Sequence, residues 1–362
     1  MKNCPNCNFE VSDTAKFCRS CGFNIKKYEE ENKEIFCEEC GAKIPFGSAF
    51  CEECGFKLDT DNASSSVGFD FGAINNISTV ATEQLYEQNG LKVENGVLVK
   101  YTGKKRNVII PGTVEEIFDK AFEENEYITN VVIEEGVQVI GASAFAFCTH
   151  LTSIEIPNSV TLIDHSAFRC CVRLTSVKIP NSVTTFGEYA FCDCTNLTSI
   201  EIPNSVTSIG KCAFRGCTNL TSLEIPNSMA SIGRCAFSGC TRLASLEIPN
   251  SISLYDNHAF QNCQSLTSVK IPNGVTIIGC CAFHNCRALT SIEIPSSVTL
   301  IDDSAFRDCT NLTSIEIPKS VTEIKSWAFQ NCTNLKTIKM SRYCKCGFGW
   351  KDNCPATVTY ID

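Results

Sequence analysis

A 23-residue period is the feature of this chain that most constrains its fold. The unit is clearest in residues 202–224, IPNSVTSIGKCAFRGCTNLTSLE, and it recurs with substitutions but without a slip in spacing. Its proline returns at Pro157, Pro180, Pro203, Pro226, Pro249, Pro272, Pro295 and Pro318, and its phenylalanine keeps the same step from Phe122 to Phe329. A fixed period of about 20–50 residues indicates similar units that stack on one another. The period therefore predicts a solenoid.

Each unit predicts one strand. In residues 220–225, LTSLEI, alternation places Leu223 and Ile225 on one face and the intervening polar residues on the other. Pro226 follows, and because proline has no N–H for a strand ladder, we expect the strand to end there.

The rest of the unit predicts the return of the coil. Val206, Ile209, Ala213 and Phe214 follow one another at spacings of one to four residues, which favours a short helical or 3₁₀ segment. One unit has too few apolar residues for a core of its own. Stacking on its neighbours gives a continuous core, so stability is expected to be a sum over adjacent coils.

The pattern LxxIxIPxSVTxIxxxAFxxCxx resembles the BspA-type leucine-rich repeats of bacteria and some protists, over about residues 108–340. The resemblance implies a mainly β, right-handed leucine-rich repeat solenoid of 23-residue coils, with parallel strands plus short helical or 3₁₀ segments. It also implies a role in protein recognition and no catalytic residues.

Surface-anchored and secreted members of that family begin with an export signal. The start of this chain, MKNCPNCNFE, has no apolar signal core. No apolar run approaches the roughly 18 residues that span a bilayer. We therefore expect a cytoplasmic protein with no membrane partner, and the alternative is a surface or secreted adhesin-like protein exported by a non-obvious route.

The N-terminal segment repeats one cysteine pattern twice. Both copies join two CxxC pairs across a ten-residue gap, and the second cysteine of three of the four pairs is followed by glycine. Two residues between cysteines let both thiolates reach one ion, and two such pairs complete a tetrahedral site. The predicted ligands are Cys4, Cys7, Cys18 and Cys21 for one ion and Cys37, Cys40, Cys51 and Cys54 for the other.

This segment resembles the double zinc ribbons of bacterial and archaeal proteins. The expected cofactor is therefore zinc, as two ions, with rubredoxin-like iron or disulfides as the alternatives. Four thiolates leave no open coordination position, which predicts structural rather than catalytic ions.

The predicted organisation follows from these patterns. It comprises a double zinc ribbon at 1–57, a flexible linker at 58–82, a β-hairpin N-terminal cap at 83–107, the solenoid at 108–340 and a C-terminal cap at 341–362. The linker is rich in Ser, Asn and Gly. Asn95-Gly96 predicts a type I′ turn in the hairpin.

Nine further cysteines keep the 23-residue step. They are Cys148, Cys171, Cys194, Cys217, Cys240, Cys263, Cys286, Cys309 and Cys332. Adjacent coils would place them about 4.8 Å apart, but with poor disulfide geometry. We therefore predict buried packing with a weak S–H donor, with redox sensing as the alternative. Asn125 holds the equivalent place in the first coil, which suggests that the position also bonds to backbone.

Catalytic patterns are scarce. His150, His165, His258 and His284 share no repeat phase, and none has the spacing of a metal-binding pair. Asp164 and His165 are adjacent, so their side chains are predicted to point apart. The chain has no nucleophile elbow, phosphate-binding glycine loop or HExxH motif. We predict that it is not an enzyme and has no small-molecule substrate.

A partly acidic strip is the candidate binding surface. The outward strand position carries Glu155, Glu201, Glu224, Glu247, Glu293 and Glu316, with lysine in some other coils. The strip predicts a basic protein partner, the alternatives being a merely solvated face or binding on the opposite side, around Tyr189, His258 and Trp327. The formal net charge of −9 argues against nucleic acid. The predicted function is a non-catalytic interaction module or scaffold.

Overall fold

The structure is a computed structural model that describes residues 2–3, 10–11, 89–252 and 254–361. The eight predicted metal-binding cysteines and the predicted linker lie outside the described residues. The chain divides into two units, one of residues 1–82 with 104–108 and the other of residues 83–103 with 109–362.

Within residues 1–82 of the first unit, two short strands are described. β1 (Lys2–Asn3) pairs antiparallel with β2 (Glu10–Val11).

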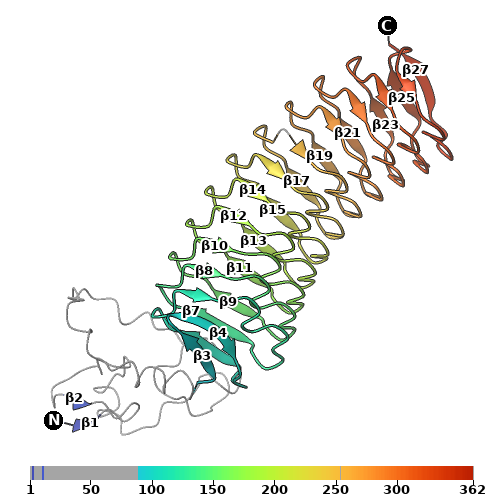
Figure 1. Cartoon of the computed structure of the whole chain (residues 1–362). Coiled ribbons are helices and arrows are strands. Elements are labelled where there is room, and N and C mark those ends of the chain that lie inside the picture. Colours follow the sequence, from blue (N-terminus) through green and yellow to red (C-terminus); the bar gives the residue numbers. More distant parts are fainter. Residues whose placement is uncertain (1, 4–9, 12–88, 253, 362) are drawn as a thin grey trace. The chain divides into compact units, whose positions relative to one another are not determined.

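The second unit is a stack of coils, most of which contribute two short strands (Figure 1). The first row consists of β5 (Asn107–Ile110), β7 (Asn130–Ile133), β9 (Ser153–Glu155), β11 (Ser176–Lys178), β13 (Ser199–Glu201), β15 (Ser222–Glu224), β17 (Ser245–Glu247), β19 (Ser268–Lys270), β21 (Ser291–Glu293), β23 (Ser314–Glu316), β25 (Thr337–Met340) and β27 (Thr357–Tyr360). The second row consists of β4 (Val97–Tyr101), β6 (Glu116–Ile117), β8 (Val139–Ile140), β10 (Leu162–Ile163), β12 (Thr185–Phe186), β14 (Ser208–Ile209), β16 (Ser231–Ile232), β18 (Leu254–Tyr255), β20 (Ile277–Ile278), β22 (Leu300–Ile301), β24 (Glu323–Ile324) and β26 (Lys345–Cys346).

Within each row the paired strands of successive coils are parallel, and between β6 and β25 their register equals the sequence period. Leu223 pairs with Leu246 in the first row, and Ile209 pairs with Ile232 in the second. The period therefore places the same residue of each unit in a column along the solenoid. The prediction of a leucine-rich repeat solenoid with parallel strands is confirmed.

The core consists of the apolar positions that the repeat predicts. In one coil Leu220 and Phe214 are fully buried and Leu223 is 5% exposed. The phenylalanines form a continuous stack in which neighbouring ring centroids are 4.7–5.7 Å apart. Stacked aromatic pairs stabilise a fold by more than their buried area alone. The one phenylalanine of each coil therefore stabilises the packing of that coil on the next.

The return segment differs from the predicted helical or 3₁₀ conformation. It contains the two-residue strand and a run of turns, and no helix occurs in the described part of the chain. Every second N–H group of this segment donates to a carbonyl group of the next coil. The N–H of Phe214 donates to Ala236 O of the next coil at 2.9 Å, whereas that of Ala213 donates to Gly210 O within its own coil at 3.3 Å. A helix would keep all these donors within the segment, so bonding between coils replaces it.

The ends of the stack are built differently from its middle. β3 (Leu91–Glu94) forms an antiparallel hairpin with β4, and Asn95 and Gly96 both have positive φ, as a type I′ turn requires. At the other end, β26 pairs with β24 and β27 pairs with β25, so residues 341–361 add a shorter coil. No helix in the described residues has the length and apolar composition needed to cross a membrane.

Candidate interaction surface

From β9 to β23 the first-row strands present one polar face, named here the strand face, formed by their first and third residues. In β15 the central Leu223 is buried while Ser222 and Glu224 are exposed. The predicted acidic residues all lie exposed on this face, Glu155 on β9, Glu201 on β13, Glu224 on β15, Glu247 on β17, Glu293 on β21 and Glu316 on β23. Burial of the middle residue fixes the direction of its neighbours, because successive strand residues point to opposite sides.

The acidic charges of the strand face are largely unpaired. Among the described residues, Glu316 forms an ion pair with Lys339 at 3.5 Å, but Glu201, Glu224 and Glu247 form none. The last three stand in consecutive coils. Repulsion between unit charges in water is about 1 kcal/mol at short range, so the fold tolerates the row while keeping its charge directed to solvent.

A shallow hollow of about 740 Å³ lies on the strand face over β17 to β23. Small serines such as Ser268 line one side, and Lys270, Glu293 and Glu316 line the other. Pro318 contributes at the edge. The hollow arises because each serine is shorter than the charged residue two positions further along the strand. It offers several carboxylates and one ammonium group to a partner.

The backbone beneath the strand face is held by bonds between coils. Thr198 Oγ1 donates to Thr175 O at 3.1 Å, and Ser205 Oγ donates to Val183 O at 2.6 Å. The proline turn is closed by the N–H of Val206 donating to Pro203 O at 3.0 Å. A rigid face loses little conformational entropy when it binds.

The in-phase cysteines pack in the core, as predicted. Cys217 Sγ donates to Phe191 O at 3.2 Å, and the other column cysteines repeat this contact with the phenylalanine 26 residues earlier. The described cysteines are free thiols, and burial raises the pKa of Cys240 to about 12. In the first coil, Asn125 Oδ1 accepts bonds from the N–H groups of Tyr127 and Ile128, which confirms backbone bonding at this position.

The predicted metal ligands of the ribbons lie outside the described residues, so their arrangement stays a prediction. The donor set itself suits the proposed ion, since thiolates in CxxC pairs are the preferred ligands of structural zinc.

One expectation about histidine was wrong, and one cluster containing a histidine was not predicted. Asp164 Oδ1 contacts Nδ1 of its neighbour His165, so these side chains do not point apart. His258 also lies beside Cys280 and Cys281, a cluster that sequence reasoning missed. The spacing of cysteine and histidine within one loop does not predict this cluster. The repeat register could have predicted it, because Cys281 lies one period after His258.

The alternative surface, on the turn side, also has a defined conformation. Tyr189, His258 and Trp327 have φ values of 60°, 61° and 57°, at the position before the repeating Ala-Phe pair. The guanidinium of Arg169 lies 5.9 Å from the centroid of the Tyr189 ring. Bulky residues at positive φ are uncommon, and here bonds to the next coil hold them.

Two family models match the chain. The BspA type leucine-rich repeat region matches residues 100–198, 184–279 and 255–346, and the double zinc ribbon matches residues 4–55. A search among curated proteins found no match.

Several solved structures are similar. A leucine rich cell surface protein from Faecalibacterium prausnitzii is 30% identical over 74% of this chain and 90% of that one, with a TM-score of 0.48. A T. pallidum leucine-rich repeat protein is 31% identical over 47% and 82%, with a TM-score of 0.44. The pneumococcal vaccine antigen PcpA is 17% identical over 76% and 87%, with a TM-score of 0.54, and shares the fold. The period, the buried columns and the family match together make this chain a member of the BspA-type leucine-rich repeat family, with a double zinc ribbon at its N-terminus.

Proposed function

We propose that this protein is a non-catalytic interaction module of the cytoplasm that binds a basic protein partner on its strand face. The observation that carries the proposal is the row of exposed, unpaired carboxylates at Glu201, Glu224 and Glu247 beside the hollow. Protein binding is typical of the repeat family. The cytoplasmic location is an expectation from the sequence, and cell fractionation tests it.

The strand face suits recognition that depends on charge more than on apolar burial. The row lies on stacked strands of consecutive coils, so the electric fields of its carboxylates add over several coils. Electrostatic complementarity of this kind mainly raises the association rate and selects the partner. Aromatic anchors, which dominate tight interfaces, do not occur among the first and third residues of β9 to β23.

The test compares two full-length triple variants with wild type. Glu201→Gln, Glu224→Gln and Glu247→Gln remove three charges from the strand face while preserving size and hydrogen bonding. Proteins captured from native cytosol by wild type, and then purified, should bind this variant at least tenfold more weakly.

The matched control removes three exposed charges elsewhere, through Glu126→Gln, Glu188→Gln and Glu323→Gln. It should bind like wild type. An equal loss of affinity in both variants would mean that binding depends only on the net charge of the protein. Unchanged affinity in the strand-face variant would rule this face out as the interface.

The ribbons are proposed to hold two structural zinc ions through their eight cysteines. The match to the double zinc ribbon family and the thiolate donor set support this proposal. Bound zinc would supply most of the folding free energy of so short a segment.

An adhesin-like role at the cell surface is the second candidate, since adhesion is also typical of the repeat family. Fractionation of native cells separates the two. Detection in the cytosol supports the proposal, and detection on intact cells or in the medium supports the second candidate.

A further inference from the structure

The turn side of the solenoid gathers three metal-ligating side chains. A ring nitrogen of His258 and the Sγ atoms of Cys280 and Cys281 all lie within 4.8 Å of one another, and all three residues are half-buried. In the described residues this is the one group of three histidine, cysteine or acidic side chains that comes so close. The two Sγ atoms are 3.6 Å apart.

The stacking of coils positions this cluster. His258 and Cys281 hold the same repeat position in adjacent coils, and both have positive φ, 61° and 51°. The N–H of His258 donates to Cys280 O at 2.8 Å, and the N–H of Cys280 donates to Asn257 Oδ1 at 2.9 Å. The three side chains therefore come from backbone that is fixed before any ligand arrives.

The buried cysteine column does not include these thiols, and cysteine is not the repeating residue at the position of Cys280. The column cysteines bury their Sγ atoms against a phenylalanine carbonyl, as Cys286 does with Phe260 O at 3.3 Å. Cys280 and Cys281 make no such contact in the described part of the chain. The position of Cys280 holds lysine, arginine or aspartate in nearby coils, at Lys211, Arg234 and Asp303.

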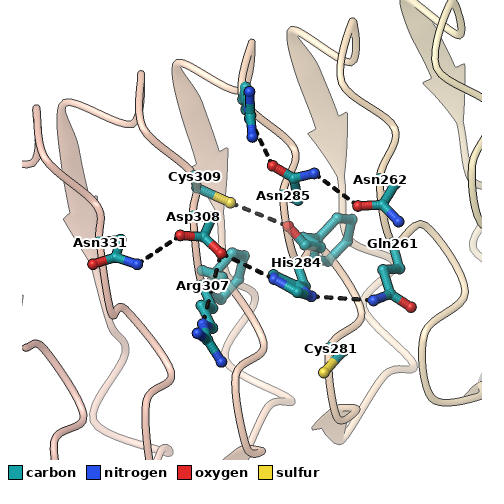
Figure 2. Close-up of polar contacts among 12 residues, drawn as sticks. Gln261, Asn262, Cys281, His284, Asn285, Arg307, Asp308, Cys309 and Asn331 are labelled. Carbon is teal, nitrogen blue, oxygen red and sulfur yellow. Dashed lines mark hydrogen bonds and ion pairs between the residues drawn. The ribbon is translucent and has the colours of Figure 1, made fainter.

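A chain of hydrogen bonds fixes the proton on the His258 ring. Asp308 Oδ2 accepts from His284 Nε2 at 3.0 Å, so His284 Nδ1 accepts from Gln261 Nε2 at 3.1 Å (Figure 2). Gln261 Oε1 then faces His258 Nδ1 at 3.0 Å and must accept its proton. The lone pair of His258 is left on Nε2. Such a partner on the second ring nitrogen is the usual support of a metal-binding histidine.

We propose that Cys280, Cys281 and His258 bind a thiophilic divalent cation, Zn²⁺, through two thiolates and the Nε2 atom. Two Zn–S bonds of about 2.3 Å at a tetrahedral angle place the sulfurs about 3.8 Å apart, close to the 3.6 Å observed. Two thiolates also neutralise the ion, and soft ligands disfavour Mg²⁺ and Ca²⁺. Three protein ligands leave one position for water.

Elemental analysis of the full-length protein tests the site. After dialysis against trace free zinc, the variant with His258→Ala, Cys280→Ser and Cys281→Ser should hold one zinc fewer per chain than wild type. That difference does not depend on what the ribbons hold. Cys212→Ser, at the repeat position of Cys281, is the matched control and should retain the wild-type count. Equal zinc in wild type and in a folded triple variant would overturn the proposal.

A second measurement uses the wild-type chain and does not depend on the folding of any variant. Zinc-loaded protein and protein treated with a strong chelator are alkylated under native conditions, and the peptide containing Cys280 and Cys281 is analysed by mass. Zinc should slow modification of this peptide at least tenfold. Equal modification in both samples, or a disulfide between the two residues, would contradict the assignment.

Discussion

At the scale of single residues, the phenylalanine stack concentrates the contacts between coils on one ring per coil. Phe214 lies between Phe191 and Phe237, with ring centroids 5.6 Å away on either side, and meets the edge of Phe186 at 5.8 Å. Loss of one ring therefore removes contacts from two interfaces at once.

Phe214→Ala should cost about 3–5 kcal/mol of local stability, as for other buried aromatic residues. In a one-dimensional array the loss should reach the adjacent coils first. Hydrogen exchange should show faster amide exchange in residues 190–240 than at the ends of the solenoid. Thr221→Ala, which removes an exposed side chain from the same coil, is the control. Equal exchange in the two variants would contradict the proposed core.

The buried thiols predict a loss of stability at alkaline pH. Burial raises the pKa of Cys240 and of Cys286 from 9.0 to about 12. Between these values the unfolded thiol is ionised and the folded thiol is not, so the unfolded state binds fewer protons. The stabilisation is complete below about pH 9 and falls as pH rises towards 12, by roughly 1.4 kcal/mol per pH unit for each thiol.

Urea unfolding with a reductant present, from pH 7.5 to 10.5, measures this effect. The midpoint should fall above pH 9, and Cys240→Ser, which keeps a donor for Phe214 O, should give a shallower fall. A midpoint that stays constant over the range would show that the column does not titrate as its burial requires.

At the scale of elements, the ribbons and the coils depend on different sources of stability. The ribbon segment is too short for an adequate core, so the proposed zinc ions would supply most of its stability, whereas each coil relies on its neighbours. Damage to one kind of element should therefore leave the other folded.

The ribbon prediction is best measured in the variant that lacks His258, Cys280 and Cys281. Elemental analysis of that protein should give two zinc ions per chain, and adding Cys18→Ser should lower the count to one. The circular dichroism of the solenoid should stay unchanged, because its core is formed by the repeating apolar residues of the coils. Iron with a rubredoxin-like absorption spectrum, or no metal at all, would refute the zinc assignment.

The elements show what a repeated sequence can and cannot predict. The strand at 222–224 and the burial of Phe214 can be predicted from the alternation and the period, because the same positions of every coil must be buried. The return segment does not, since apolar spacings of one to four residues suit a helix and a run of turns equally. The choice depends on N–H groups that bond to the next coil, such as that of Phe214 to Ala236 O. That partner lies 22 residues away in sequence.

The same reason explains the missed cluster. His258 and Cys281 are adjacent in space only because the coils stack in register, so a search for ligand pairs within one loop does not find them. Aligning the coils by their period does place them together, but it does not give the bond from Gln261 that orients the ring.

At the scale of the whole molecule, the solenoid separates two chemistries onto two surfaces. The strand face carries carboxylates over a regular sheet, while the turn side carries the histidine and cysteine cluster. Because each coil contributes to both surfaces through different residues, substitutions on one surface should leave the other intact. The zinc count of the strand-face triple variant should therefore equal that of wild type.

One lysine, Lys270, lines the hollow. Lys270 stands between Glu247 and Glu293, so it interrupts the acidic row. Lys270→Glu would join Glu201, Glu224 and Glu247 to Glu293 and Glu316, giving six consecutive acidic coils. Repulsion between neighbouring unit charges is only about 1 kcal/mol in water, so the fold should tolerate the longer row. A basic partner should then associate faster at low salt, and its association rate should fall more steeply as the Debye length shortens towards about 8 Å at physiological ionic strength.

Stopped-flow or surface-based kinetics from 20 to 500 mM salt would measure this change with the purified partner. Lys178→Glu, which makes the same charge change on the strand face outside the hollow, is the control and should have the smaller effect. Slower association of Lys270→Glu would mean that the lysine meets an acidic group of the partner, and identical rates for both variants would place the contact away from the hollow. Either result would exclude the hollow as the basic-partner site, since steering by a local cluster of charge must depend on where the charge is added.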